Sequence, residues 1–311
     1  MALVDLGARV SLADSLIPEY GGNLWNVASI KDKVHINYSD VRDEHSMKFL
    51  VQGQDYLFNL AGQTSHVDSM QNPYTDLEIN ARAQLFILEA CRRHNPEIKI
   101  VFASTRQIYG RPLYLPVDEK HPLYPVDVNG INKMAGEWYH IVYNNVYGIR
   151  SAVLRLTNTY GPRMRVKDAR QTFLGIWIKQ LIESEPLLVF GDGTQIRDFT
   201  YVDDAVQAFL ATAASDSTNG RVYNVGGDER ISLKDLARLL IEINGQGSFE
   251  IVPFPPDRKV IDIGDYYCDD GLIRETLGWR PETALADGLA KTIAYYREFL
   301  HHYAGGAGNG A

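Results

Sequence analysis

A few polar side chains in this sequence have types and spacings that suit a phosphorylated ligand. Asn129 and Lys133 are four residues apart in a segment with helical periodicity, so they lie on one face of a helix. Asp14 ends a predicted strand, where a carboxylate can accept the ribose hydroxyls of an adenosine. Arg163 and Arg258 could assist a pyrophosphate, because the guanidinium fork matches phosphate oxygens. These residue types favour a nucleotide ligand.

The overall charge and composition exclude several other classes. The chain has 311 residues and a formal net charge of −8, from 31 Lys and Arg against 39 Asp and Glu. An acidic surface disfavours nucleic-acid binding, which depends on many Lys or Arg contacts with phosphates. No apolar run reaches the roughly 18 residues that a membrane span needs, and the first residues lack the pattern of a secretory signal. We expect a cytoplasmic protein with no membrane or nucleic-acid partner.

The cysteines and acidic clusters do not indicate a metal site. Cys91 and Cys268 are far apart and lack a CxxC or metal-ligand spacing, so we expect reduced, buried or half-exposed thiols. Asp198, Asp203 and Asp204 are close in sequence, but we interpret them as a loop that enters a helix. We therefore expect no metal.

Strands and helices alternate through the first half of the chain. Segments 76–94 and 132–148 have apolar residues at helical spacing. The predicted strands are short apolar runs at 8–14, 33–40, 55–62, 98–105 and 149–158. This alternation predicts an α/β fold with a doubly wound parallel sheet of Rossmann type, whose ligands bind at the carboxyl ends of the strands.

The second half has a different character and predicts a smaller C-terminal substrate lobe. We assign residues 1–158 and about 199–228 to the Rossmann-type lobe, and 159–198 and 229–303 to the substrate lobe. Ser232, with Asp235 three residues later, is the expected N-cap of a helix. The Gly- and Ala-rich tail 304–311 is expected to be disordered.

The Gly-rich turn that normally follows the first strand of such a sheet is missing. No GxGxxG or GxxGxxG occurs, and Gly21-Gly22 comes only after the first predicted strand. The opening ALVDLGARV is similar to the end of the first helix and the second strand. Either Met1 is an internal or misassigned start, or the protein has lost the turn and holds a dinucleotide weakly or not at all. We favour the first, because the rest of the sheet is coherent.

Nine strings in order resemble the extended short-chain dehydrogenase/reductase family of NAD-dependent nucleotide-sugar epimerases and dehydratases. The resemblance spans nearly the whole chain. The strings are LADS, SDVRD, NLAGQTSHVDSMQNP, EIN, FASTRQIYG, LRLTNTYGPR, GDGTQIRDFTYVDD, YNVGG and LGWRP.

The resemblance implies NAD as cofactor and a nucleotide-diphosphate sugar as second ligand. Ser15 rather than Arg follows Asp14, which favours NAD over NADP. The residues expected to bind the cofactor are Asp14, Asp40, Val41, Leu60, Ala61, Gly62, Asn80 and Lys133. Asp14 could instead be a helix cap and Asp40 a plain turn residue.

The residues expected to touch the sugar nucleotide lie mostly in the second half. Thr105 matches the Ser or Thr that hydrogen-bonds the reacting hydroxyl, and Tyr109 is expected to be structural. Dehydratases of the family carry Asp and Glu after this Thr, whereas this chain has Arg106 and Gln107, so dehydration is not expected. The expected substrate-binding residues are Thr105, Asn158, Arg163, Arg197 and Arg258. Arg197 could instead pair with Asp198 or Asp203.

The catalytic position is the largest departure from the family. The pattern Tyr-x-x-x-Lys is represented by Asn129 and Lys133, so the catalytic set is Thr105, Lys133 and Asn129. A missing general acid–base costs ~10²–10⁴-fold in rate. Tyr124 and Asp127 are the nearest groups by sequence that could replace the tyrosine.

Two functions remain open at this level. The first is NAD-dependent modification of a nucleotide sugar, C4-epimerase-like, with an altered proton relay. The second is a catalytically impaired member that binds NAD or a nucleotide sugar without turnover. The intact Asn158 and Arg197 favour the enzyme. The resemblance also implies a homodimer.

Overall fold

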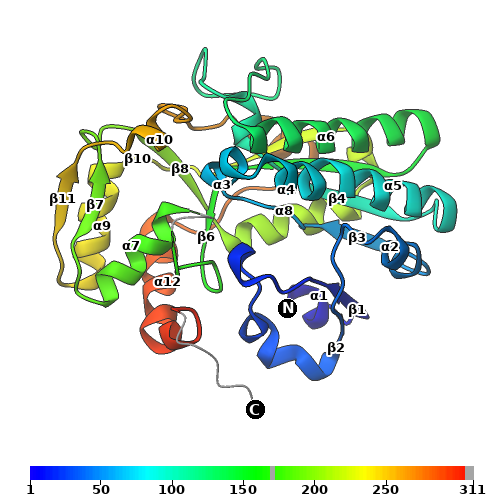
Figure 1. Cartoon of the computed structure of the whole chain (residues 1–311), viewed down its shortest axis with the longest axis horizontal. Helices are drawn as coiled ribbons and strands as arrows, with labels where there is room; N and C mark the ends of the chain where they lie inside the picture. The colour runs from blue at the N-terminus through cyan, green and yellow to red at the C-terminus, as the bar shows by residue number, and fades with distance from the viewer. Residues whose placement is uncertain (169–171, 305–311) are drawn as a thin grey trace.

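The computed structural model describes residues 1–168 and 172–304. Residues 305–311 of the expected tail lie outside the described residues. Two groups of elements are visible in Figure 1: parallel strands between helices on one side, and a smaller group of short strands and helices on the other.

The larger group contains a four-stranded parallel sheet in the order β3-β4-β5-β9. Its strands are β3 (Tyr56–Asn59), β4 (Lys99–Thr105), β5 (Ser151–Leu156) and β9 (Val222–Val225). Strand β4 is buried along most of its length, as expected of a parallel strand covered on both faces. In register, Thr105 pairs with Leu156 at the carboxyl end of the sheet.

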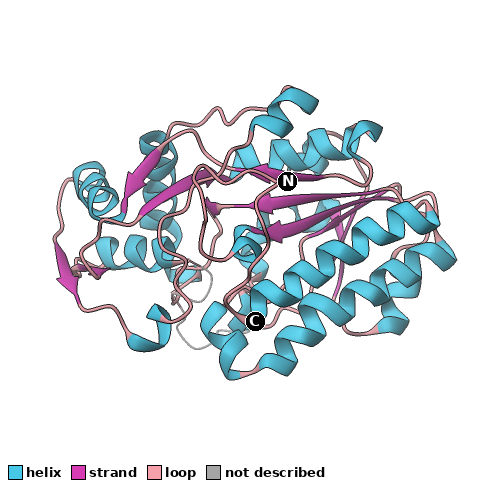
Figure 2. Cartoon of the chain, turned by 90° about the horizontal axis from the view of Figure 1, so that it is seen from above, coloured by secondary structure: helices cyan, strands magenta, loops and turns pink. Residues whose placement is uncertain are grey.

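Helices cover both faces of this sheet, which confirms the doubly wound α/β architecture. Helix α6 packs against β4 and β5 from one side and α8 from the other, and Figure 2 shows the strands between helices. The helices around the sheet are α2 (Glu44–Leu50), α3 (His66–Gln71), α4 (Pro73–Leu77), α5 (Ala83–His94), α6 (Val128–Tyr147), α8 (Val202–Ala214) and α11 (Gly271–Leu277).

Local sequence signals explain the ends of these helices. Asp127 caps the N-terminus of α6 by accepting the Gly130 amide at 2.7 Å, and Gly148 ends α6 with a left-handed φ of 71°. The helix predicted over 76–94 is interrupted by a π-helical segment, η3 (Glu78–Arg82). Such segments occur often at functional sites.

The first two strands form a separate parallel pair. Strands β1 (Val10–Ala13) and β2 (Val34–Asn37) follow the short helix α1 (Ala2–Asp5). Among the described residues, β1 pairs only with β2, and β3 pairs only with β4. The parallel strands are thus divided between β1 and β3, and Tyr56 and Leu60 of the β3 region are exposed.

The smaller group has its own apolar core. Trp177, Leu236 and Leu289 are buried in one cluster from three helices. Its elements are β6 (Asn158–Tyr160), β8 (Ile196–Tyr201), β10 (Arg230–Ser232), β7 (Leu187–Phe190), β11 (Phe249–Val252), α7 (Phe173–Ile182), α9 (Leu233–Asn244), α10 (Pro256–Lys259) and α12 (Leu285–Phe299). Ser232 caps α9 as predicted, accepting the Asp235 amide at 3.1 Å.

Short 3-10 segments complete the described chain. They are η1 (Pro18–Tyr20), η2 (Leu24–Lys33), η4 (Arg106–Tyr109), η5 (Asp216–Thr218) and η6 (Leu300–His302). No helix among the described residues is long and apolar enough to cross a membrane. Both cysteines are buried and reduced, in agreement with the sequence prediction.

Candidate functional site

Lys133 lies in α6 with its ammonium group against the central strand of the sheet. Its Nζ donates to the Ala103 carbonyl of β4 at 3.1 Å and lies 5.1 Å from the centre of the Phe102 ring. The side chain is buried, and burial lowers the pKa of Lys133 to about 8, although the charge of Asp76 opposes that shift. A buried ammonium with one carbonyl partner has hydrogen-bonding capacity left for a ligand.

Gly62 and Asn80 meet Lys133 at the same point. A Cβ atom on Gly62 would lie 2.7 Å from Lys133 Nζ and 3.0 Å from Asn80 Oδ1. Asn80 sits in η3, where its amide donates to the Gln63 carbonyl at 2.9 Å. Its Oδ1 is buried with no hydrogen-bond partner in the described chain. A glycine cradle beside an unpaired acceptor and a cation fits a ribose with two hydroxyls, so these residues fit the nicotinamide end of NAD.

Asn129 has a structural role that the sequence did not indicate. Its side chain is buried, and its Nδ2 donates to the Gln63 carbonyl at 2.7 Å and to Asp76 Oδ2 at 3.0 Å. Its backbone N–H donates to Ser69 Oγ at 3.2 Å. Both side-chain amide protons of Asn129 are therefore committed to α4 and the loop after β3, and its backbone N–H is committed to α3.

A second polar group beside this position was missed from the sequence. His66 Nδ1 lies 3.0 Å from Asp127 Oδ2, the same oxygen that accepts Gln107 Nε2 at 2.7 Å. Burial alone would raise the pKa of Asp127, but its bonds to His66, Gly130 and Gln107 lower it overall. Asp127 is therefore a carboxylate, and about one third of the His66 side chain is exposed. The position of His66 in the sequence does not indicate that it lies beside Asp127, so only the fold reveals this pair.

Tyr124, the other proposed substitute for the tyrosine, is placed differently. It lies in the loop before α6 with 64% of its surface exposed, and it shares no hydrogen bond with Asn129 or Lys133 in the described part of the chain. Tyr109 is structural as predicted, because it is fully buried and its hydroxyl donates to Asn224 Oδ1 at 2.7 Å.

Thr105, Arg106 and Asn158 lie near one another at the carboxyl edge of the sheet. Thr105 ends β4, and its Oγ1 accepts the Gln107 amide at 3.3 Å, which starts η4. Arg106 Nη2 donates to Asn158 Oδ1 at 3.0 Å, and Asn158 Nδ2 donates to the Asp198 carbonyl at 2.9 Å. This chain of contacts connects the sheet edge to β8.

Arg197 follows on β8 and is almost completely buried. Its Nη1 donates to the carbonyls of Ile196 and Gly264, and its Nη2 lies 3.6 Å from Asp262 Oδ1. Burial, and next the charge of Arg106, lower the pKa of Arg197 to about 10. The expected alternative partners, Asp198 and Asp203, form no ion pair with it among the described residues, so the guanidinium is held by carbonyls and by Asp262.

The other two predicted arginines lie further into the smaller group of elements. Arg163 is stacked 5.6 Å from the ring centre of Tyr295 in α12, and Arg258 is 5.6 Å from that of Phe190 in β7. Both are half-buried. The described contacts do not join either one to the Thr105–Asn158 group, so their role on a pyrophosphate stays a prediction.

The residues expected at the adenosine end lie at the divided edge of the sheet. Asp14 Oδ1 accepts the Leu16 amide at 2.7 Å in an exposed turn after β1. Asp40 makes a two-pronged contact with Arg42, which lowers the pKa of Asp40. Val41, Leu60 and Ala61 are partly or largely exposed. The described contacts leave these positions untested as cofactor ligands.

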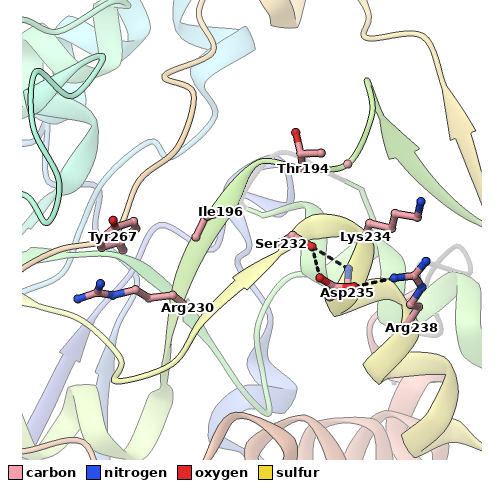
Figure 3. Close-up of a pocket in the computed structure, with 9 residues that line it drawn as sticks. Thr194, Ile196, Arg230, Ser232, Lys234, Asp235, Arg238 and Tyr267 are labelled. Atoms are coloured by element: carbon pink, nitrogen blue, oxygen red, sulfur yellow. Dashed lines mark hydrogen bonds and ion pairs between the residues drawn. The ribbon is translucent and has the colours of Figure 1, made fainter.

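A shallow cavity of about 470 Å³ lies elsewhere, between β8, β10 and the start of α9 (Figure 3). Arg230, Lys234 and Arg238 line it, and Arg238 is already paired with Asp235 at 2.8 Å. It contains none of the predicted site residues. Its lining is exposed or partly exposed except for Gly193, in contrast to the buried groups around Lys133.

The divided parallel sheet, with a buried lysine under a glycine cradle at its carboxyl edge, defines a Rossmann-type dinucleotide-binding protein. The profile of the NAD dependent epimerase/dehydratase family matches residues 5–226, so the chain belongs to that family. The relatives of this family place the chain in the extended short-chain dehydrogenase/reductase group.

Three relatives illustrate the match. A putative UDP-glucose 4-epimerase of Methanocaldococcus jannaschii is 32% identical over 88% of this chain and 87% of its own length. A dTDP-glucose 4,6-dehydratase of Streptomyces griseus is 31% identical over 90% of this chain and 83% of its own length. The solved UDP-glucose 4-epimerase of Thermotoga maritima, with UDP-glucose, has a TM-score of 0.85 at 28% identity, covering 96% of this chain and 94% of that one.

Proposed function

We propose that this chain oxidises and re-reduces a nucleotide-diphosphate sugar at C4, in the manner of an epimerase. The observation that carries this proposal is the convergence of Gly62, Asn80 and Lys133 beside β4, the strand that ends in Thr105. In a parallel sheet the carboxyl edge is the ligand edge. A ribose held there and a sugar hydroxyl held by Thr105 would be neighbours.

The chain's own residues would hold the cofactor at its nicotinamide end. NAD, when bound, supplies a hydride acceptor that can return the hydride. Lys133 would bind the ribose hydroxyls, and Asn80 Oδ1, which is buried and without a partner in the described chain, would accept one of them. Gly62 leaves the space that a side chain would fill.

The altered proton relay is assigned to His66 and Asp127. Asn129 cannot serve, because both its amide protons are committed and an amide does not ionise near neutral pH. Asp127 Oδ2 lies 3.0 Å from His66 Nδ1 without forming an aligned hydrogen bond to it, and a small turn of the ring would let the carboxylate hold Nδ1–H and leave Nε2 to accept a proton. Thr105 would orient the sugar hydroxyl, and the imidazole would take its proton and return it later.

Substitution of His66 tests the proposal. We expect His66→Gln to slow interconversion of a nucleotide sugar by ~10²–10⁴-fold, with the melting temperature unchanged. His45→Gln, an exposed histidine on α2, is the matched control. Product can be followed by NMR of the sugar. Full activity in His66→Gln would remove His66 from the relay, whereas binding without turnover in the unaltered chain would favour the impaired-enzyme alternative.

We also propose a homodimer through α6. Trp138, Val142 and Val146 are spaced by four residues and are exposed at 51%, 46% and 64%. An apolar stripe of this kind on a helix is typical of an interface. Light scattering should give twice the chain mass, and Trp138→Glu with Val142→Glu should give the monomer. A monomeric unaltered protein would contradict the dimer.

A further inference from the structure

Arg106 is a cation at the sheet edge without an anionic partner. It follows Thr105 directly, and one prong of its guanidinium, Nη2, is held by Asn158 Oδ1 at 3.0 Å. The other prong, Nη1, is buried and has no hydrogen-bond partner in residues 1–168 and 172–304. Within the same ranges, no carboxylate oxygen forms an ion pair with Arg106. Asn158 therefore fixes the orientation of the guanidinium, and Nη1 is the nitrogen left for a ligand.

The groups around Arg106 are polar, but among the described residues none of them forms an ion pair with its guanidinium. The Tyr266 ring centre lies 5.4 Å from the guanidinium carbon. Asp198 is the nearby acid, but its Oδ2 accepts the Cys268 amide at 3.1 Å and its Oδ1 has no partner among the described groups. Arg197 is engaged by carbonyls and Asp262. Burial lowers the pKa of Arg106, so the fold by itself disfavours the charge.

Buried N–H groups without acceptors are uncommon in folded proteins, and buried charges are usually paired. An arginine that retains one unpaired prong beside a ligand edge therefore suits an anionic ligand group. A carboxylate oxygen suits this one prong, because a guanidinium N–H forms a strong, charge-assisted hydrogen bond with an ionised oxygen. Asn158, fixed by the Asp198 carbonyl at 2.9 Å, keeps the fork in place.

We propose that Arg106 binds a carboxylate on the sugar, so that the substrates are nucleotide-linked uronic acids. This rests on the proposed function, since Thr105 is there the residue that holds the reacting sugar. The same anionic chemistry could come from the diphosphate of the ligand. The sugar is favoured because Arg106 adjoins Thr105 in the chain, whereas Arg163 and Arg258 lie among other elements.

Calorimetric titration of the full chain separates these sources, with UDP-glucuronate, UDP-glucose and UDP as probes. The first two differ only at C6, and the third lacks the sugar. We expect the unaltered chain to bind UDP-glucuronate about 10-fold or more tighter than UDP-glucose. Arg106→Gln should remove that preference while it leaves the affinities for UDP-glucose and UDP within about 3-fold.

Two further variants complete the test. Arg106→Lys keeps the charge without the fork and should retain only part of the preference. Arg93→Gln, on the exposed face of α5, should bind all three probes like the unaltered chain. Melting temperatures will show that each variant is folded.

The outcomes distinguish this inference from the proposed function. Equal affinity of the unaltered chain for UDP-glucuronate and UDP-glucose would overturn the carboxylate assignment and leave the sugar-nucleotide function standing. An equal loss for all three probes in Arg106→Gln would assign Arg106 to the diphosphate. Absence of binding for every probe would overturn both proposals.

Discussion

Asn129→Ala should destabilise the protein, because the amide that replaces the family's tyrosine is part of the fold. The Asn129 side chain donates to the Gln63 carbonyl and to Asp76 Oδ2, and both acceptor residues are buried, at 2% and 0% exposure. Truncation leaves the Gln63 carbonyl with its second donor, Asn80, but removes the donor of the buried, charged Asp76 Oδ2. At ~1–3 kcal/mol for one unsatisfied group, the free energy of unfolding should fall by about 1–3 kcal/mol.

Thermal unfolding measures this loss directly. For a chain of this length, a loss of that size corresponds to a melting temperature lower by about 2–5 °C. Asn145→Ala is the matched control, since Asn145 is exposed on the same helix and the replacement has the same effect on helix propensity. A melting temperature for Asn129→Ala equal to that of Asn145→Ala would refute the assignment of a structural role to Asn129.

Three further predictions follow from buried groups. Lys133 has a folded pKa of about 8 against 10.5 unfolded, so its charge destabilises the fold below pH 8 and this penalty disappears as the pH rises. Lys133→Met should therefore be more stable than the unaltered chain by about 1–3 kcal/mol at pH 7. Urea unfolding at several pH values should show that this difference in stability becomes smaller towards pH 10. A difference that stays constant with pH would contradict the prediction. Cys91 and Cys268 are buried with raised thiol pKa values, so a thiol reagent should label them only in urea; rapid native labelling would show that they are accessible. Arg155→Met should cost about 3–5 kcal/mol, because it leaves the Glu137 carboxylate unpaired and buried; urea unfolding measures the loss, and an unchanged midpoint would refute it.

The sequence predicted much of the sheet and one end of the site. Each of the five predicted strands overlaps an observed strand, because buried parallel strands are short, continuous apolar runs. Gly62, Asn80 and Lys133 lie together because α6 packs against η3 beside the loop that follows β3, and their role as cofactor ligands stays a prediction.

The remaining features depend on contacts between distant segments and on side-chain direction. The sequence did not show that Asn129 is bound by Asp76, which lies 53 residues away, or that His66 meets Asp127 across α3 and α6. It predicted Arg197 as a ligand residue, but not that carbonyls would hold its guanidinium. Spacing along one helix or strand is readable in a sequence, whereas pairing between elements requires the fold.

The central claim is that Gly62, Asn80 and Lys133 form a binding site for NAD. Calorimetric titration of NAD into the unaltered chain and into Gly62→Val tests it most directly, because a side chain at Gly62 would begin 2.7 Å from Lys133 Nζ. We predict one NAD bound per unaltered chain and an affinity weaker by about 10-fold or more in Gly62→Val. No binding to the unaltered chain, or equal affinity in both proteins, would contradict the account.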